Sequence, residues 1–164
     1  MQTSLKNIHK RALSHKTHRF GGLYSLLTVS NLRWAFYQLN KKAATGVDNV
    51  SFCDYEKDLE RNLESLVLRL KNKTYKAKLI RRKMIPKSPG KMRPLGIPAL
   101  EDKLVQCAVS KILGEIYEAD FIDNSYGYRP CKGAKDAVSK LSRLASHDSY
   151  HYVVEADIKG FFDN

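Results

Sequence analysis

The 164-residue sequence has few cysteines, no long apolar run and, over one long stretch, no acidic residue. Its three cysteines, Cys53, Cys107 and Cys131, are odd in number and far apart, and they match neither a zinc spacing nor a disulfide framework. This pattern predicts a reducing, cytoplasmic compartment. No apolar run reaches the roughly 18 residues that a membrane-spanning helix needs. The basic segment 1–19 also lacks the apolar core of a secretion signal.

Acidic residues are missing from residues 65–100, which hold eleven Lys and Arg. The formal net charge is +12 at pH 7, with +15 over residues 1–100 and −3 over residues 101–164. Such asymmetry predicts a polyanionic partner that binds mainly the first half of the chain. Nucleic acid is favoured over a membrane surface, because no segment combines an apolar face with a Lys/Arg-rich face cleanly.

Hydrophobic periodicity predicts an α+β protein, because helices and strands alternate irregularly along the chain. Residues 1–20 are expected to form a basic arm that is flexible or ordered by a partner. Helices are predicted after a cap at Thr28, Ser30 or Asn31, from Ser51 through Leu70, from Glu101 through Ile116, and over Gly133–Ala145. In the last of these, Ala134, Val138, Leu141 and Leu144 are expected to face inward. Strands are predicted over Tyr75–Met84, over Met92–Ile97 and, deep in a sheet, over Tyr150–Asp157. Pro86 is expected to end the first of them.

The two basic strands around residues 88–90 are expected to form a hairpin. Its cations are Arg81, Arg82, Lys83, Lys87, Lys91 and Arg93. Alternate side chains of a strand share a face, so several of these cations can point one way and contact a phosphate backbone or a triphosphate. The alternative is a solvated ribbon whose charges protect a sheet edge.

The segment 153–164 offers a candidate metal site. An apolar strand is predicted to end at Asp157, Gly160 allows close approach, and Phe162 is placed to flank a sugar. The alternative for Asp157 is a structural cap. Glu155 would share a strand face with Asp157, either as a second ligand or as an exposed strand residue. One carboxylate is too few for two-metal phosphoryl transfer.

A third candidate is the loop Ser125–Pro130, in which Tyr126, Tyr128 and Arg129 alternate with small residues. Aromatic side chains interleaved with Arg can stack on bases and bind phosphate. The alternative is a structured loop that its two tyrosines anchor.

Together the motifs resemble the group II intron reverse transcriptases, or intron-encoded maturases. The matching segments, in family order and spacing, are Phe20–Tyr24, Thr45–Asp48, Ile85–Lys87, Gly90–Pro98, Asp102–Gln106, Ser125–Pro130 and Asp157–Asn164. The resemblance implies reverse-transcriptase fingers with an N-terminal helical extension, followed by the first strand of a palm. The domains expected on this basis are an arm over 1–20, fingers over 21–149 and the start of a palm over 150–164.

The resemblance also implies roles for single residues. Asp157, helped by the backbone carbonyl of Ile158, would hold catalytic Mg²⁺. Lys87 and Arg93 would contact the incoming dNTP, and Phe162 would lie under its sugar and reject a 2′-hydroxyl. The N-terminal helices and the basic segment would meet template and intron RNA. The residues assigned to RNA binding are Arg81, Arg82, Lys83, Lys91 and Arg129.

The implied activity is RNA-directed DNA synthesis on an RNA template from a DNA primer. The family's second palm motif, a Tyr-x-Asp-Asp turn, and its thumb are not in these residues, so we expect no polymerisation from them alone. A non-catalytic maturase remnant that helps intron RNA fold and splice is the alternative. A retron-type or diversity-generating reverse transcriptase is a third. No membrane partner is expected, and exposed apolar surface predicts association.

Overall fold

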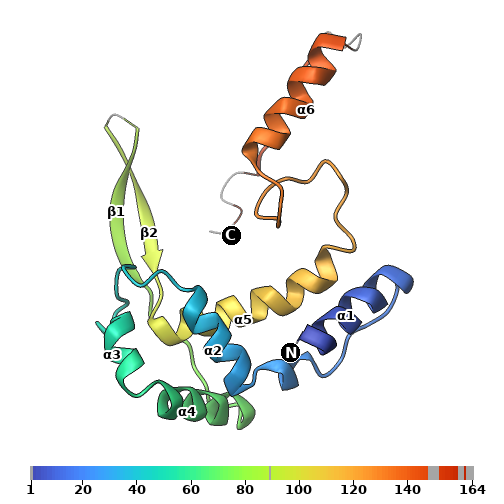
Figure 1. Cartoon of the computed structure of the whole chain (residues 1–164). Helices are drawn as coiled ribbons and strands as arrows, with labels where there is room; N and C mark the ends of the chain where they lie inside the picture. The colour runs from blue at the N-terminus through green and yellow to red at the C-terminus, as the bar shows by residue number, and fades with distance from the viewer. Residues whose placement is uncertain (1, 89, 148–151, 159–160, 162–164) are drawn as a thin grey trace. The chain divides into compact units, whose positions relative to one another are not determined.

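The chain divides into two compact units, Met1–Asp120 and Phe121–Asn164. Within them, the computed structural model describes residues 2–88, 90–147, 152–158 and 161. The first unit contains α1 (Gln2–Ser14), the short 3-10 helix η1 (Leu23–Leu26), α2 (Val29–Gln38), α3 (Phe52–Lys57), α4 (Leu59–Lys71), β1 (Arg81–Ser88), β2 (Lys91–Ile97) and α5 (Leu100–Tyr117) (Figure 1). The second contains α6 (Ala134–His147). Helices combined with one antiparallel ribbon agree with the predicted α+β class.

The core of the first unit forms where α2, α3, α4 and α5 meet. Phe36 of α2 is fully buried and stacks on Phe52 of α3, with ring centroids 4.0 Å apart. Leu63 and Leu66 of α4 and Leu104 of α5 are also fully buried. Burial of side chains of this size supplies about 1.5–3 kcal/mol each, so this cluster is the main source of the unit's stability.

Side-chain caps set where two of the helices begin. Thr28, one of the three predicted caps, accepts a hydrogen bond from the backbone N–H of Asn31 and starts α2. Ser51 accepts one from the N–H of Asp54 and starts α3, as predicted. The prediction of a single helix from Ser51 to Leu70 is wrong in one respect. The chain breaks at Asp58, whose φ of −123° and ψ of 38° lie outside the helical region, so two helices form.

The expectation of a flexible arm at the N-terminus is also wrong for residues 2–14, which form α1. Leu5 and Ala12 lie on one face of this helix and are buried. The helix packs on α5, and a ring nitrogen of His9 lies 3.0 Å from the carbonyl oxygen of Glu115. The apolar residues of this basic segment are few, but they fall at the spacing that one helix face requires.

In the second unit, α6 confirms the helix predicted over 133–145, but not its burial. Val138 and Leu141, expected to face inward, are 61% and 58% exposed. The described part of this unit contains no other helix or strand that could cover them.

The strand expected over 150–157 is not found in its described part. Residues 152–158 have no regular secondary structure and are exposed. A strand needs a neighbour to pair its N–H and C=O groups, and in the described ranges β1 and β2 pair only with each other. Tyr150 and His151 lie outside the described residues. None of the helices in the described ranges has the length and apolar character needed to cross a bilayer.

Candidate nucleic-acid interface

The predicted hairpin is present as an antiparallel ribbon of β1 and β2. Its register pairs Arg81 with Ile97, Lys83 with Leu95, and Ile85 with Arg93. Pro86 does not stop the first strand as expected but pairs with Met92 inside it. A proline is tolerated here because a two-stranded ribbon leaves each strand an unpaired outer edge.

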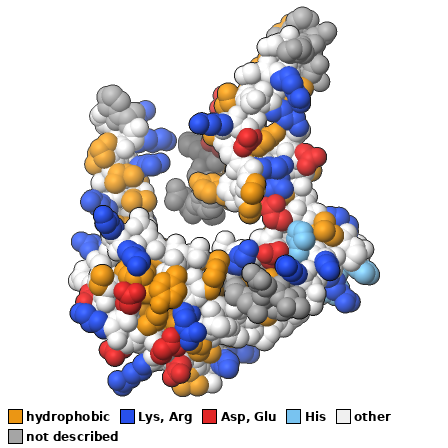
Figure 2. Space-filling view, viewed as in Figure 1, with side chains coloured by type: hydrophobic (Ala, Val, Ile, Leu, Met, Phe, Trp, Pro, Cys, Tyr) orange, Lys and Arg blue, Asp and Glu red, His pale blue; other side chains and the backbone are white. Residues whose placement is uncertain are grey.

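The register sorts the cations onto two faces, because paired residues share a face and successive residues alternate. One face, called here the cationic face, carries Arg81, Lys83, Lys91 and Arg93, together with the apolar residues Ile85, Leu95 and Ile97. The opposite face carries Arg82 with Met84, Pro86, Met92 and Pro94. In the upper part of the ribbon, Figure 2 shows Lys and Arg side chains on one side and hydrophobic ones on the other, whereas toward the base Lys and Arg side chains lie on the second side too. The structure therefore separates Arg82 from the other predicted RNA-binding residues of the ribbon.

Lys87 lies at an irregularity of the ribbon. The register shifts by one residue between Pro86 and Ser88, which is the signature of a β-bulge. Lys87 is the extra residue and is exposed. Alternation does not fix its face, so the bulge can direct its side chain separately from those of Lys83 and Arg93.

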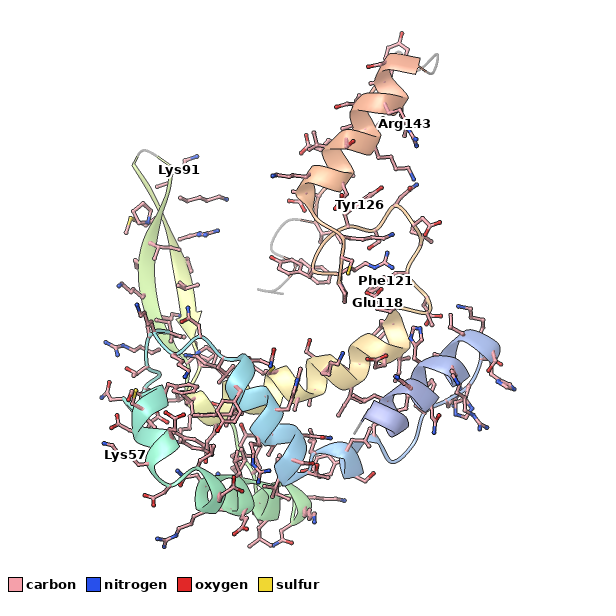
Figure 3. All side chains as sticks on the ribbon, viewed as in Figure 1. Lys57, Lys91, Glu118, Phe121, Tyr126 and Arg143 are labelled. Atoms are coloured by element: carbon pink, nitrogen blue, oxygen red, sulfur yellow. The ribbon has the colours of Figure 1, made fainter. Side chains whose placement is uncertain are left out.

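The cationic face has almost no internal charge compensation. Lys83, Lys91 and Arg93 are exposed, and none of them forms an ion pair or hydrogen bond with its side chain among the described residues. Figure 3 shows Lys91 close to the turn of the ribbon. Arg81, at the base, donates a hydrogen bond to the side-chain oxygen of Asn49 at 3.4 Å. A row of uncompensated cations in a two-stranded ribbon is an electrostatic site for phosphate groups.

Carboxylates of the first unit gather at the base of the ribbon. Asp102, in the first turn of α5, is 4% exposed and accepts hydrogen bonds from the Tyr75 hydroxyl and from the backbone N–H of Lys78, the latter at 3.1 Å. Its neighbour Glu101 accepts from Arg69 at 2.7 Å and from the Tyr55 hydroxyl at 3.2 Å. These acids therefore bind structural partners and leave the ribbon's cations unneutralised.

The same base holds the loop that contains Thr45–Asp48. Asp48 pairs with the Lys78 ammonium group at 2.9 Å, and Lys103 donates to the carbonyl of Ala44 at 2.7 Å. Gly46 is buried against the start of α5, where a Cβ atom would lie 2.5 Å from the Cα of Ala99. Only glycine fits a contact of this kind, so Gly46 lets the loop touch the turn between β2 and α5.

Two tyrosines at this base have raised pKa values. Burial raises the pKa of Tyr75, and the hydrogen bond to Asp102 adds to the effect, because loss of the proton would place two negative charges together. Burial raises the pKa of Tyr55 in the same way, with the charge of Glu101 as the next cause. Both hydroxyls therefore remain donors at neutral pH.

We expect Tyr75→Phe to lower the free energy of unfolding by about 1 kcal/mol at neutral pH, because one hydrogen bond to the buried carboxylate of Asp102 is lost. The raised pKa makes this contribution fully present below the unfolded-state value of about 10 and lost as pH rises through the folded-state value. The difference between wild type and Tyr75→Phe should therefore shrink above about pH 10. Urea unfolding at neutral and alkaline pH measures it. The control Tyr128→Phe, at an exposed tyrosine, should unfold like wild type at both pH values. A difference between wild type and Tyr75→Phe that stays the same above pH 10 would contradict the hydrogen bond from the Tyr75 hydroxyl to Asp102.

The loop Ser125–Pro130 is internally bonded. The Arg129 guanidinium donates to the carbonyls of Ile122 and Ser125, both at 2.9 Å, and lies 4.9 Å from the centre of the Phe121 ring. The ammonium group of Lys132 lies 5.5 Å from the centre of the Tyr126 ring. Arg129, predicted to bind RNA, therefore already supports its own loop. Tyr128 is fully exposed, and its φ of 56° is unusual for a bulky residue.

Asp157 is exposed, and one of its oxygens accepts a hydrogen bond from the N–H of Ile158 at 3.0 Å. Its predicted neighbour Phe162 lies outside the described residues. A carboxylate next to a backbone carbonyl suits a hard divalent cation in donor type. In the described part of the chain, however, no three His, Cys, Asp or Glu side chains gather at one point. Asp157 and Ile158 therefore fit as part of a metal site and do not complete one.

Comparison with known proteins agrees with the resemblance seen in the motifs. Residues 85–164 match the family model of reverse transcriptase (RNA-dependent DNA polymerase). The chain is 36% identical over 163 residues to group II intron-encoded protein LtrA of Lactococcus lactis subsp. cremoris, which covers 98% of this chain and 27% of LtrA. It is 38% identical over 121 residues to protein YkfC of Escherichia coli (strain K12), covering 72% of this chain and 32% of YkfC. An uncharacterized 91 kDa protein in the cob intron of Schizosaccharomyces pombe is 31% identical over 102 residues, covering 62% of this chain and 12% of that protein.

The chain thus spans less than a third of the length of LtrA and of YkfC. The family match includes most of the ribbon, all of α5 and the segment with Asp157, whereas the likeness to LtrA extends over almost the whole chain. These matches, together with the ordered motifs, show that the chain belongs to the reverse transcriptase family, among the group II intron-encoded reverse transcriptases and maturases.

Proposed function

We propose that this region binds RNA across the cationic face of the ribbon, as part of an RNA-directed DNA polymerase. The observation that carries the proposal is the placement of Lys83, Lys91 and Arg93 on one exposed face with no carboxylate partner among the described residues. Cations held in this way release counterions from a phosphate backbone when they bind it, which favours a polyanion without reading its sequence. The partners of the whole protein would be intron RNA or an RNA template, and a DNA primer.

We assign Lys87 and Arg93 to the incoming dNTP, and Phe162 to its sugar. Arg93 suits the task because its guanidinium can bind two phosphate oxygens at once, and the bulge frees Lys87 from the alternation of the strand. Arg93 also lies on the cationic face, where it can contact RNA phosphate when no dNTP is bound. The assignment of Phe162 rests on the family motif at residues 157–164 and on its spacing of five residues from Asp157.

Enzymes of this family generally use divalent metal ions. We assign Asp157 and the carbonyl of Ile158 to a Mg²⁺ site whose remaining ligands lie outside the described residues. Bound there, Mg²⁺ would stabilise the charge that develops on the reacting phosphate oxygens. The contribution of this chain is to hold a carboxylate and to present the triphosphate through Lys87 and Arg93.

The test of RNA binding is Lys83→Gln with Arg93→Gln in one protein. Loss of two phosphate contacts should reduce the slope of log K against log salt by roughly 1.8, or about 1.4 on single strands. Affinity for RNA at low salt should fall on the order of 10- to 100-fold. Fluorescence anisotropy with a labelled RNA, titrated over a series of salt concentrations, gives both quantities.

The matched control removes the same charge elsewhere. Arg61→Gln with Lys71→Gln takes one Arg and one Lys from exposed positions on α4. This control should lower affinity only slightly, because the net charge changes but no proposed contact is lost. Equal losses in the two double variants would show that RNA responds to net charge alone, and the cationic face would not be the interface.

A further inference from the structure

Both strands of the ribbon are attached to the first turn of α5. β2 ends at the buried Ile97 and reaches the helix through Pro98 and Ala99, of which Ala99 is fully buried. On the other side, the segment 75–80 leads into β1 without forming regular structure, and its exposed residues include Leu79 and Ile80. A segment of this kind has no ladder to fix its course, so its direction depends on the few contacts it makes.

Those contacts converge on Asp102. One carboxylate oxygen accepts from the Tyr75 hydroxyl, and the other accepts from the backbone N–H of Lys78. The side chain is buried, and it lies in the first turn of α5, where the helix dipole favours a negative charge. Because each oxygen has its own donor, the carboxylate holds residues 75–80, called here the lead-in segment, at two points three residues apart.

Neighbouring contacts act on the same segment but are more exposed. The Lys78 ammonium group pairs with Asp48, and Arg81 bonds Asn49. Lys78 and Arg81 are exposed at their side chains, so solvent and salt weaken these bonds. Among the described side chains that bond residues 75–81, Asp102 is the one that is buried. We therefore expect Asp102 to contribute more than Asp48 or Asn49 to holding this segment in place.

We propose that Asp102 is a positioning residue, which fixes the lead-in segment to α5 and thereby sets the orientation of the cationic face toward RNA. This inference rests on the proposed function of that face. Asp102 itself is buried at the base of the ribbon and is not expected to touch RNA. Its effect would pass through Tyr75 and Lys78 to the strand that carries Arg81 and Lys83.

Charge alone and the positioning role predict opposite changes in RNA affinity when the carboxylate of Asp102 is removed, which makes the proposal testable. Removing a carboxylate from a basic protein should tighten its binding to RNA, because one repulsive charge is lost. If Asp102 positions the ribbon, Asp102→Ala should instead weaken binding by about 10-fold. Asp102→Asn should restore most of the affinity, because its amide can accept from the Lys78 N–H and donate to the Tyr75 hydroxyl.

The experiment measures RNA anisotropy and thermal unfolding for both variants, with amide hydrogen exchange at Lys78. Glu56→Gln removes an exposed carboxylate of α3 as the matched control and should bind RNA as tightly as wild type or slightly more. If Asp102→Ala does not fold, Tyr75→Phe removes only one of the two hydrogen bonds and should weaken binding by about 3-fold. Wild-type or tighter binding by Asp102→Ala, or by Tyr75→Phe where the former does not fold, would overturn the proposal.

A double-variant cycle separates this inference from the proposed function. Where Lys83→Gln and Arg93→Gln are already present, Asp102→Ala should cause little further loss, because the cations that it positions are gone. A full 10-fold further loss would show that Asp102 acts elsewhere and would refute the positioning role. If the double variant Lys83→Gln with Arg93→Gln binds RNA as tightly as the control Arg61→Gln with Lys71→Gln, the cationic face is not the RNA interface. The proposed function is then refuted, and the positioning role, which depends on it, is refuted as well.

Discussion

Replacing Asp157 by alanine is expected to abolish primer extension in a protein that joins this chain to the palm and thumb of a group II intron reverse transcriptase. The loss should be about a thousandfold or more, because removing a metal ligand forfeits several kcal/mol of charge stabilisation in the transition state. RNA binding should remain near wild type, since Asp157 is acidic and lies apart in sequence from the basic ribbon. Gel-based primer extension with saturating template, alongside anisotropy, measures the two properties.

Glu155→Ala is the matched control for this prediction. Glu155 is another exposed carboxylate in the same irregular segment, two residues before Asp157. If it is only an exposed residue, the variant should keep most of its activity, whereas an equal loss would make it a second ligand. Normal extension by Asp157→Ala, in an otherwise active fusion, would refute the catalytic assignment. An inactive fusion that still binds RNA tightly would favour the non-catalytic maturase alternative.

Local signals predicted most elements of the first unit. Thr28 and Ser51 cap their helices as expected, because a cap depends on a side chain and on backbone groups only a few residues away. The ribbon was predicted from two basic segments with interspersed apolar residues, one on each side of a Ser-Pro-Gly loop. Glu101 and Asp102 were correctly placed in the first turn of a helix.

The sequence did not reveal what these acids bind. Asp102 contacts Tyr75 and Lys78, which lie 27 and 24 positions earlier in the chain. No local rule pairs such residues, because the contact exists only after the ribbon has folded back onto α5. A usable signal was present, since Asp102 lies between Leu100 and Leu104 on a helix whose neighbouring positions are buried. A charged residue among buried positions requires a partner.

The segment around Asp157 shows where sequence reasoning depends on structure that these residues do not supply. Its two adjacent valines, Val153 and Val154, favour a strand, but strand propensity is realised only when a neighbouring strand pairs with the segment. Residues 152–158 have no such neighbour in the described ranges and remain irregular. The role of Asp157 therefore stays a prediction from the family motif, and the same is true of Phe162.

Gly46→Ala is expected to be the most destabilising small substitution in the first unit. An added Cβ would lie 2.5 Å from the Cα and 2.6 Å from the N of Ala99, and 2.9 Å from the carbonyl carbon of Pro98. All three are backbone atoms at the junction of β2 and α5, so no side-chain rotation can relieve the clash. We expect a loss of roughly 3 kcal/mol or more in the free energy of unfolding, at the upper end for overpacking, and a melting temperature lower by on the order of 10 °C.

Gly114→Ala is the opposite case, because the same methyl group is added where nothing lies within 4 Å. Gly114 is inside α5, so alanine should stabilise the helix by about 0.5–1 kcal/mol. Urea unfolding of the two variants should therefore show shifts of opposite sign for one chemical change. The Gly46 variant should also bind RNA more weakly, because the loop it displaces holds Lys78 through Asp48 and so supports the ribbon. A Gly46→Ala protein as stable as wild type would mean that the loop does not pack against α5 as this structure has it.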